Sequence, residues 1–93
     1  MATVSEAILL AFDLHAAGRL DEAETLYDRI LDADPEHPDA LHLSGILLGQ
    51  TGRLHDGLAR VAKAIARRPD SAEFHINHGN LLRAAGHFAS ICG

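Results

Sequence analysis

The chain has 93 residues, a formal net charge of −5 and a single cysteine, Cys92. This length allows one small domain, and a lone cysteine excludes an internal disulfide. The longest apolar run near the N-terminus is 7–12, and no basic residue precedes it, so the sequence predicts neither a signal peptide nor a transmembrane helix. We therefore expect a cytoplasmic protein with no membrane partner.

The charge is distributed unevenly along the chain. Residues 1–40 hold ten acidic and two basic residues, a net charge of −8, whereas residues 41–93 hold three acidic and six basic residues, a net charge of +3. Six bases dispersed over the second half, without interleaved aromatic residues, do not form the basic patch that nucleic-acid binding requires. No nucleic-acid partner is expected.

A short pattern recurs at a fixed spacing. Gly18, Gly52 and Gly86 follow one another at intervals of 34 residues, and Pro35 and Pro69 are separated by the same interval. A period of this length indicates helical hairpins stacked in an array, because one hairpin cannot bury its apolar face alone. The sequence predicts one all-α domain over residues 1–93, an antiparallel helix-hairpin array in a right-handed superhelix of about two and a half repeats: 4–37, 38–71 and a partial 72–93.

The first helix is predicted over residues 4–17. Thr3 and Glu6 have the spacing of a capping box, in which each side chain bonds the backbone amide of the other residue. Gly18 suits the left-handed position that follows a helix. One face of this helix has apolar residues at helical spacing and is expected to pack inward: Ala7, Leu10, Ala11 and Leu14.

Four further helices are predicted from caps and breakers. The second begins near Asp21 and ends before Pro35, because proline cannot continue a helix. The third begins at Pro38, where proline is tolerated in a first turn, and ends at residue 50 or 51. The fourth covers residues 55–67 and the fifth 72–85, the latter capped by Asp70 or Ser71. A sixth helix would begin near Phe88.

Two glycines fall inside the predicted helices. Gly45, in the third helix, is expected to permit a close crossing by another helix. Gly57, in the fourth helix, occupies the position that Ala23 has in the first repeat. Because glycine is poor in helix interiors, this equivalence predicts that Gly57→Ala stabilises the protein by about 0.5–1 kcal/mol.

The recurring residues resemble the tetratricopeptide repeat family over essentially the whole chain. This resemblance implies a protein–protein interaction module that binds a peptide or a partner protein in the concave groove of the array. The positions that carry it are Gly18, Ala23, Tyr27, Pro35, Gly45, Gly52, Pro69 and Gly79.

A narrower resemblance concerns the segments 26–43 and 73–84. They look like the N-terminal repeats of large bacterial proteins that often carry an O-GlcNAc-transferase-like domain after the repeats. This implies an alternative function: the chain is the substrate-presenting front of a larger glycosyltransferase-like protein whose catalytic domain is absent here.

In the family that the chain resembles, the first helices of successive repeats line the concave groove. Apolar anchors among polar side chains suit an extended peptide or a helix. Asn80 also matches an asparagine that recurs in transferase-type arrays. The predicted groove residues are Ser5, Ile8, Phe12, His15, Asp39, His42, Ile46, Gln50, Glu73, Ile76, Asn80 and Arg83.

No catalytic residue, cofactor or metal site is predicted. Ser44 and His78 share a repeat position, but a nucleophile also needs a group that orients its base, so we interpret them as a polar pair between repeats. His75 and His78 are one helical turn apart, and zinc requires three or four converging ligands.

The end of the array predicts self-association. The fifth helix has no sixth helix of useful length beside it, which leaves an apolar patch that seeks a protein partner. A second copy can offer the same patch in a two-fold contact. We expect a homodimer through the C-terminal half-repeat, formed by Leu81, Leu82, Phe88 and Ile91.

Overall fold

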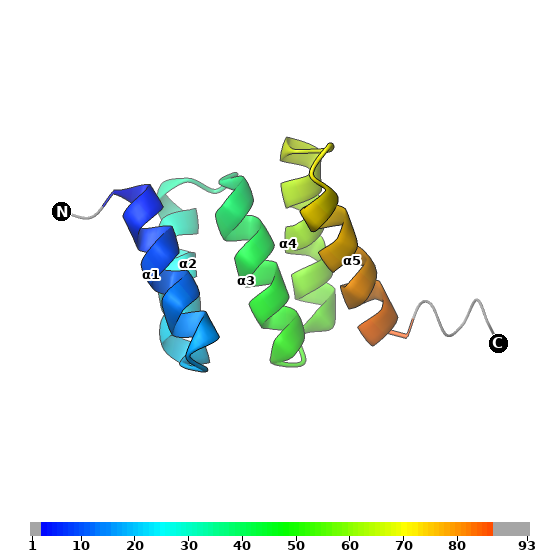
Figure 1. Cartoon of the computed structure of the whole chain (residues 1–93), viewed down its shortest axis with the longest axis horizontal. Helices are drawn as coiled ribbons and strands as arrows, with labels where there is room; N and C mark the ends of the chain where they lie inside the picture. Colours follow the sequence, from blue (N-terminus) through cyan, green and yellow to red (C-terminus); the bar gives the residue numbers. More distant parts are fainter. Residues whose placement is uncertain (1–2, 87–93) are drawn as a thin grey trace.

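The computed structural model describes residues 3–86, and these residues form five α-helices and no strand (Figure 1). Every helix boundary lies within about one residue of the predicted position, because the caps and breakers that predict it act locally. The all-α prediction is confirmed. The helices are α1 (Val4–Ala16), α2 (Leu20–Ala33), α3 (Pro38–Gln50), α4 (Leu54–Arg67) and α5 (Ala72–Ala84).

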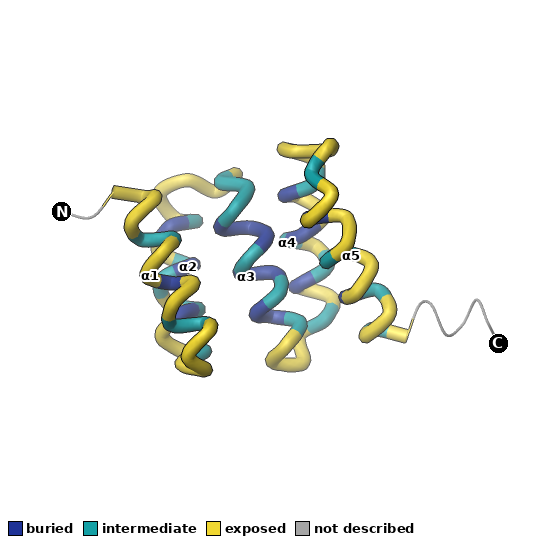
Figure 2. The backbone as a smooth tube through the Cα atoms, viewed as in Figure 1, coloured by how far each residue is buried: buried dark blue, intermediate teal, exposed yellow. Residues whose placement is uncertain are grey.

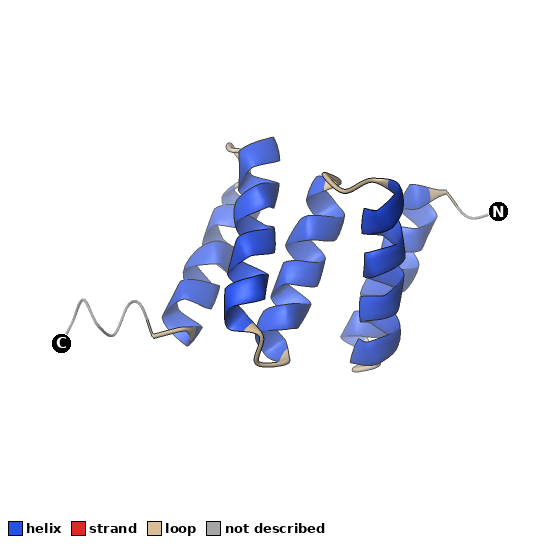
Figure 3. Cartoon of the chain, turned by 180° about the vertical axis from the view of Figure 1, so that it is seen from behind, coloured by secondary structure: helices blue, strands red, loops and turns tan. Residues whose placement is uncertain are grey.

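The helices form two layers. α1, α3 and α5 follow one another in the nearer layer of Figure 1, and the reverse view of Figure 3 brings α2 and α4 to the front. Each second helix runs back along the first helix of its own hairpin, and α3 contacts both α1 and α5. This is a stack of hairpins in sequence order, with α1 and α5 at its opposite ends. The right-handed sense of the superhelix stays a prediction.

Side chains cap the first helix of each unit. The Thr3 hydroxyl accepts from the Glu6 amide at 3.1 Å, and the Glu6 carboxylate accepts from the Thr3 amide at 3.3 Å, which confirms the capping box. His37 Nδ1 accepts from the backbone amide of residue 40 at 3.2 Å at the start of α3. Ser71 Oγ accepts from the amide of residue 74 at 3.3 Å at the start of α5. These bonds satisfy amides that have no partner within their own helix.

The three corner glycines share one backbone conformation. Gly18, Gly52 and Gly86 have φ angles of 83°, 87° and 86°, in the left-handed region where a side chain is strained. After the first of them, the Arg19 amide donates to the Leu14 carbonyl at 2.9 Å, and the same bond recurs one repeat later. This backbone arrangement ends a helix by satisfying its last carbonyl groups.

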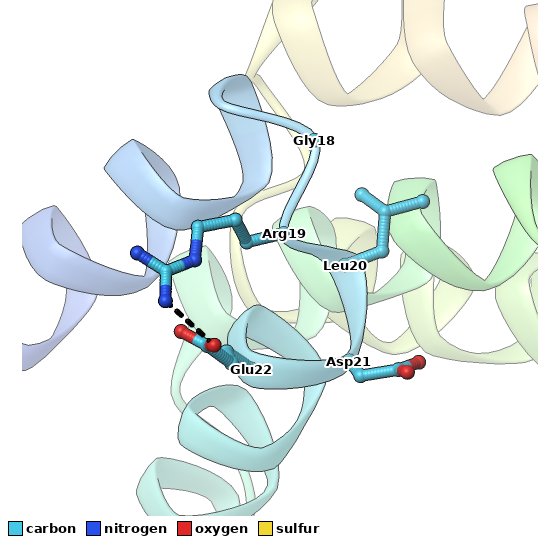
Figure 4. Close-up of a pocket in the computed structure, with 5 residues that line it drawn as sticks. All are labelled: Gly18, Arg19, Leu20, Asp21 and Glu22. Carbon is cyan, nitrogen blue, oxygen red and sulfur yellow. Dashed lines mark hydrogen bonds and ion pairs between the residues drawn. The ribbon is translucent and has the colours of Figure 1, made fainter.

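Figure 4 shows the first corner and its side chains. Arg19 and Glu22 form an ion pair at 2.8 Å, with their side chains 60% and 53% exposed. A pair this exposed contributes little stability. Leu20, at the start of α2, packs instead against the buried cluster of the first hairpin, so the corner is held by its backbone and by this leucine.

The core is organised around α3, the helix with the most buried residues in Figure 2. The first cluster joins it to α1 and α2, and the second joins it to α4 and α5. Residues of the first cluster are Ala11, Ala23, Tyr27 and Leu47, with Leu14, Leu20, Leu26 and Leu43 packed against them. Residues of the second are Leu41, Ala64 and Phe74, with Leu31 and Ile65.

One part of the predicted α1 face does not pack inward. Ala11 is fully buried, but Leu10 is 54% exposed. The equivalent residue of the next repeat, Ser44, is 1% exposed, and its helix α3 has helices of neighbouring units on both sides, α1 and α5. The prediction that Leu10 is a core residue is therefore wrong, since among the described residues nothing covers that side of α1.

The glycines of α3 and α4 lie at a direct backbone contact. A Cβ atom on Gly57 would lie 2.5 Å from the carbonyl oxygen of Gly45, and one on Gly45 would lie 2.8 Å from the carbonyl oxygen of Gly57. The close crossing predicted for Gly45 is confirmed. The predicted benefit of Gly57→Ala is wrong, because the added methyl group would overlap the backbone of α3, although the first repeat has alanines at both equivalent positions, Ala11 and Ala23.

Four ion pairs in the described part of the chain account for much of the uneven charge. Each joins an acid from residues 1–40 to an arginine from residues 53–68. The shortest of these pairs involves Arg53, whose two terminal nitrogens donate to the Glu24 carboxylate at 2.9 and 2.6 Å. This bond lowers the pKa of Glu24. The other pairs are Arg60–Asp28 at 3.4 Å, Arg67–Glu36 at 3.5 Å and Arg68–Asp39 at 3.2 Å.

The glycine contact yields a prediction with an internal control. Gly57→Ala should lower the free energy of unfolding by about 1–3 kcal/mol, because the methyl group forces two backbones apart. Gly79 is also inside a helix, but apart from the backbone of its own helix no atom lies within 4 Å of the Cβ position. Gly79→Ala should therefore raise it by about 0.5–1 kcal/mol. Urea unfolding measures both, and equal shifts in the two variants would contradict the backbone contact.

Candidate functional site

The structure brings together seven of the predicted groove residues between α1 and α3. A hollow of about 260 Å³ lies near the start of both helices, and a second of about 380 Å³ lies near their ends. We call these two hollows the α1–α3 groove. The first is lined by Ser5, Ile8, Leu9, His37 and Asp39, and the second by Phe12, His15, Ala16, Leu43, Ile46 and Gln50.

His15 ties the second hollow to both neighbouring helices. Its Nε2 lies 2.6 Å from Gln50 Oε1 on α3, and its Nδ1 lies 3.3 Å from the Tyr27 hydroxyl on α2. Burial raises the pKa of Tyr27 to about 12, so the hydroxyl keeps its proton and can donate. Because the amide oxygen only accepts, the imidazole donates from Nε2 and accepts at Nδ1. The polar wall of this hollow is therefore fixed in place.

His42 does not reach the groove surface. It is 2% exposed and stacks on Phe74, with ring centroids 4.3 Å apart. The Asn77 amide donates to its Nε2 at 3.0 Å, so this histidine joins α3 to α5. The prediction that it contacts a ligand is wrong, because the third unit covers it. Predicting its burial would have required knowing that Phe74 and Asn77 of α5 lie against it.

The predicted groove residues of α5 lie outside the two hollows. Glu73, Ile76, Asn80 and Arg83 are all exposed. Ile76 is 63% exposed although it is a large apolar residue. Their participation in the same binding surface stays a prediction.

The polar pair predicted between repeats does not form. Ser44 is buried, and its hydroxyl donates to the Leu41 carbonyl of its own helix at 3.3 Å. His78, its expected partner, is half-buried. Within residues 3–86, no three His, Cys, Asp or Glu side chains converge as a metal site would require.

The structure removes one residue, Leu81, from the predicted self-association patch. Leu81 is 8% exposed and packs over Gly49, where a Cβ atom would overlap its side chain. It is therefore an internal contact between α5 and α3, and the prediction that it binds a second copy is wrong. Leu82 is half-buried. Phe88 and Ile91 lie outside the described residues.

Comparison with known families agrees with the fold. The chain matches the tetratricopeptide repeat family over residues 14–85. This match covers more than half of the chain, so the protein belongs to that family. The repeats of that family are non-catalytic modules that generally mediate protein–protein interaction. A comparison with curated proteins finds no significant match. Among the described residues, no helix has the length and apolar character needed to span a membrane.

The buried imidazole predicts a pH-dependent stability. Burial lowers the pKa of His42 below its usual 6.5, and the nearby carboxylates of Glu73 and Asp39 oppose this only in part. Below about pH 6.5 the unfolded chain binds a proton that the native side chain resists, so the free energy of unfolding falls as the pH decreases. Protonation also removes the acceptor that Asn77 uses.

Thermal unfolding between about pH 7.5 and pH 5.5 measures this effect. The midpoint should fall in the native protein, and His42→Gln should flatten the dependence because glutamine does not titrate. His55→Gln alters an exposed histidine and should leave the slope unchanged. Equal slopes in the native protein and in His42→Gln would contradict the assignment.

Proposed function

We propose that the α1–α3 groove binds a peptide or an extended segment of a partner protein. The observation that carries this proposal is the pair of adjacent hollows. Apolar side chains of α1 line the first hollow beside His37 and Asp39, and apolar side chains of both α1 and α3 line the second. Phe12 is 48% exposed although it is a large aromatic residue, and it lines the second hollow. Pockets that hold apolar anchors beside a few fixed polar groups are typical of peptide recognition.

The spacing of the hollows sets the shape of the ligand. Ile8 lines the first hollow and His15 the second, seven residues further along α1. A helix rises 1.5 Å per residue, so the hollows are about 10 Å apart. Two apolar side chains seven residues apart on a helix span this distance, and so do two side chains three residues apart in an extended chain.

The charge around the groove favours a neutral or basic segment. The described helices α1 and α3 contain no lysine or arginine. The one acidic residue that lines the hollows, Asp39, is paired with Arg68 at 3.2 Å. Glu6 and Asp13 lie on α1 outside the hollows, so an acidic ligand would meet like charge only beside the groove.

A second candidate is the substrate-presenting front of a glycosyltransferase-like protein. Asn80 supports it, because it is exposed on α5 and could bond a peptide backbone. This role would use the same binding surface, extended over the third unit. Asn80→Ala would weaken binding under this candidate and leave binding confined to α1 and α3 unchanged.

Binding can be tested with a displayed library of random peptides, followed by calorimetry on a selected sequence. Phe12→Ala and Ile46→Ala should each weaken its binding about tenfold, because each removes an apolar wall of the second hollow. Leu10→Ala is the matched control, since Leu10 is 54% exposed on α1 but lines neither hollow. Equal losses in all three variants, or none, would place the binding surface elsewhere.

A further inference from the structure

The two junctions between units use equivalent positions. On α3, Leu43 and Leu47 face the preceding hairpin and pack into the cluster of α1 and α2. On α5, the residues one repeat later are Asn77, which bonds His42, and Leu81, which packs over Gly49. The same side of each first helix therefore meets the unit before it.

The corresponding side of α1 is apolar and exposed. The residue equivalent to Leu43 and Asn77 is Leu9, which is 64% exposed, and Leu10 beside it is 54% exposed. The residue equivalent to Leu47 and Leu81 is Asp13, also exposed. We call Leu9, Leu10 and Asp13 the leading face of the array. Two adjacent exposed leucines on one helix form a surface that favours burial against protein.

The opposite end of the array carries the positions that would receive such a face. His42 and Gly49 of α3 are the residues that meet Asn77 and Leu81. One repeat of 34 residues later, they correspond to Ile76 and Arg83 on α5. Ile76 is 63% exposed. We call Ile76 and Arg83 the trailing face.

We propose that copies of this chain associate head to tail, with the leading face of one copy on the trailing face of the next. The observed contacts join His42 to Asn77 and Gly49 to Leu81. The equivalent contacts one repeat later would join Ile76 of one copy to Leu9 of the next, and Arg83 of one copy to Asp13 of the next. The first pair joins two exposed apolar side chains, and the second joins opposite charges. The two pairs were chosen by the register of the repeat alone, and in both of them the side chains are chemically compatible.

The charges on the two faces support this order of association, because Asp13 lies on the leading face and Arg83 on the trailing face. Two leading faces or two trailing faces would place like charges together, whereas a leading face on a trailing face places opposite charges together. The contact is heterologous, because the two faces differ, and it continues the stacking of the hairpins from one molecule to the next. It goes beyond the proposed ligand binding, since Leu10, Asp13, Ile76 and Arg83 line neither hollow of the groove, although Leu9 also lines the first hollow.

Cross-linking of cysteine variants tests the register. In a Cys92→Ser background, the double variant Leu9→Cys/Ile76→Cys should give dimers and a ladder of larger species with a short bismaleimide. Each single variant should give no product, whereas an equal mixture of the two single variants should give dimers only. Ala59→Cys/Ile76→Cys is the matched control, because residue 59 is exposed on α4 away from both faces, and it should give no ladder.

Two results would overturn the proposal. Strong dimers from either single variant would indicate a two-fold contact, and equal products from the control pair would indicate random collision. Sedimentation of the unmodified chain provides a second measurement, in which the mean mass should rise with concentration. Asp13→Lys should lower the ladder yield several-fold by placing like charges at the contact, and an unchanged yield would remove the charged pair from the interface.

Discussion

The fold depends on the contact between α3 and α4, where Gly45 and Gly57 bring two backbones together without a side chain between them. This contact fixes the rotation of α3 about its own axis. One side of the helix then faces α1 and supplies Leu43, Ile46 and Gln50 to the groove. Another side faces α5 and buries His42 under Phe74. The candidate site and the junction with the third unit are thus two results of one close crossing.

Local chemistry made the helices predictable from the sequence. Thr3, Ser71 and the corner glycines act within a few residues of themselves, so their spacing indicates the helix ends directly. The repeat register also indicates which positions share a face, and seven predicted groove residues do line two adjacent hollows. The register could not indicate what lies opposite each position, because that depends on residues a repeat away.

The wrong predictions share this cause. Gly57 was compared with Ala23, but its neighbour across the crossing is another glycine instead of an alanine. Leu10 was predicted to pack inward from the helical spacing of apolar residues, although the first helix has no described hairpin on that side. Leu81 was assigned to the surface, but it packs over Gly49. In each case the residue was assigned to the correct helix, and its environment differed from the one expected.

Two polar contacts between first helices span the same interval of sequence. His15 bonds Gln50 at 2.6 Å, and His42 bonds Asn77 at 3.0 Å. In each bond, the two residues are 35 positions apart in the sequence. Apolar faces can slide past one another at little cost, whereas a directional bond is lost if a helix slips by one turn of about 5.4 Å. These bonds keep the first helices in register, so the offset between the first helices of successive units stays constant along the array.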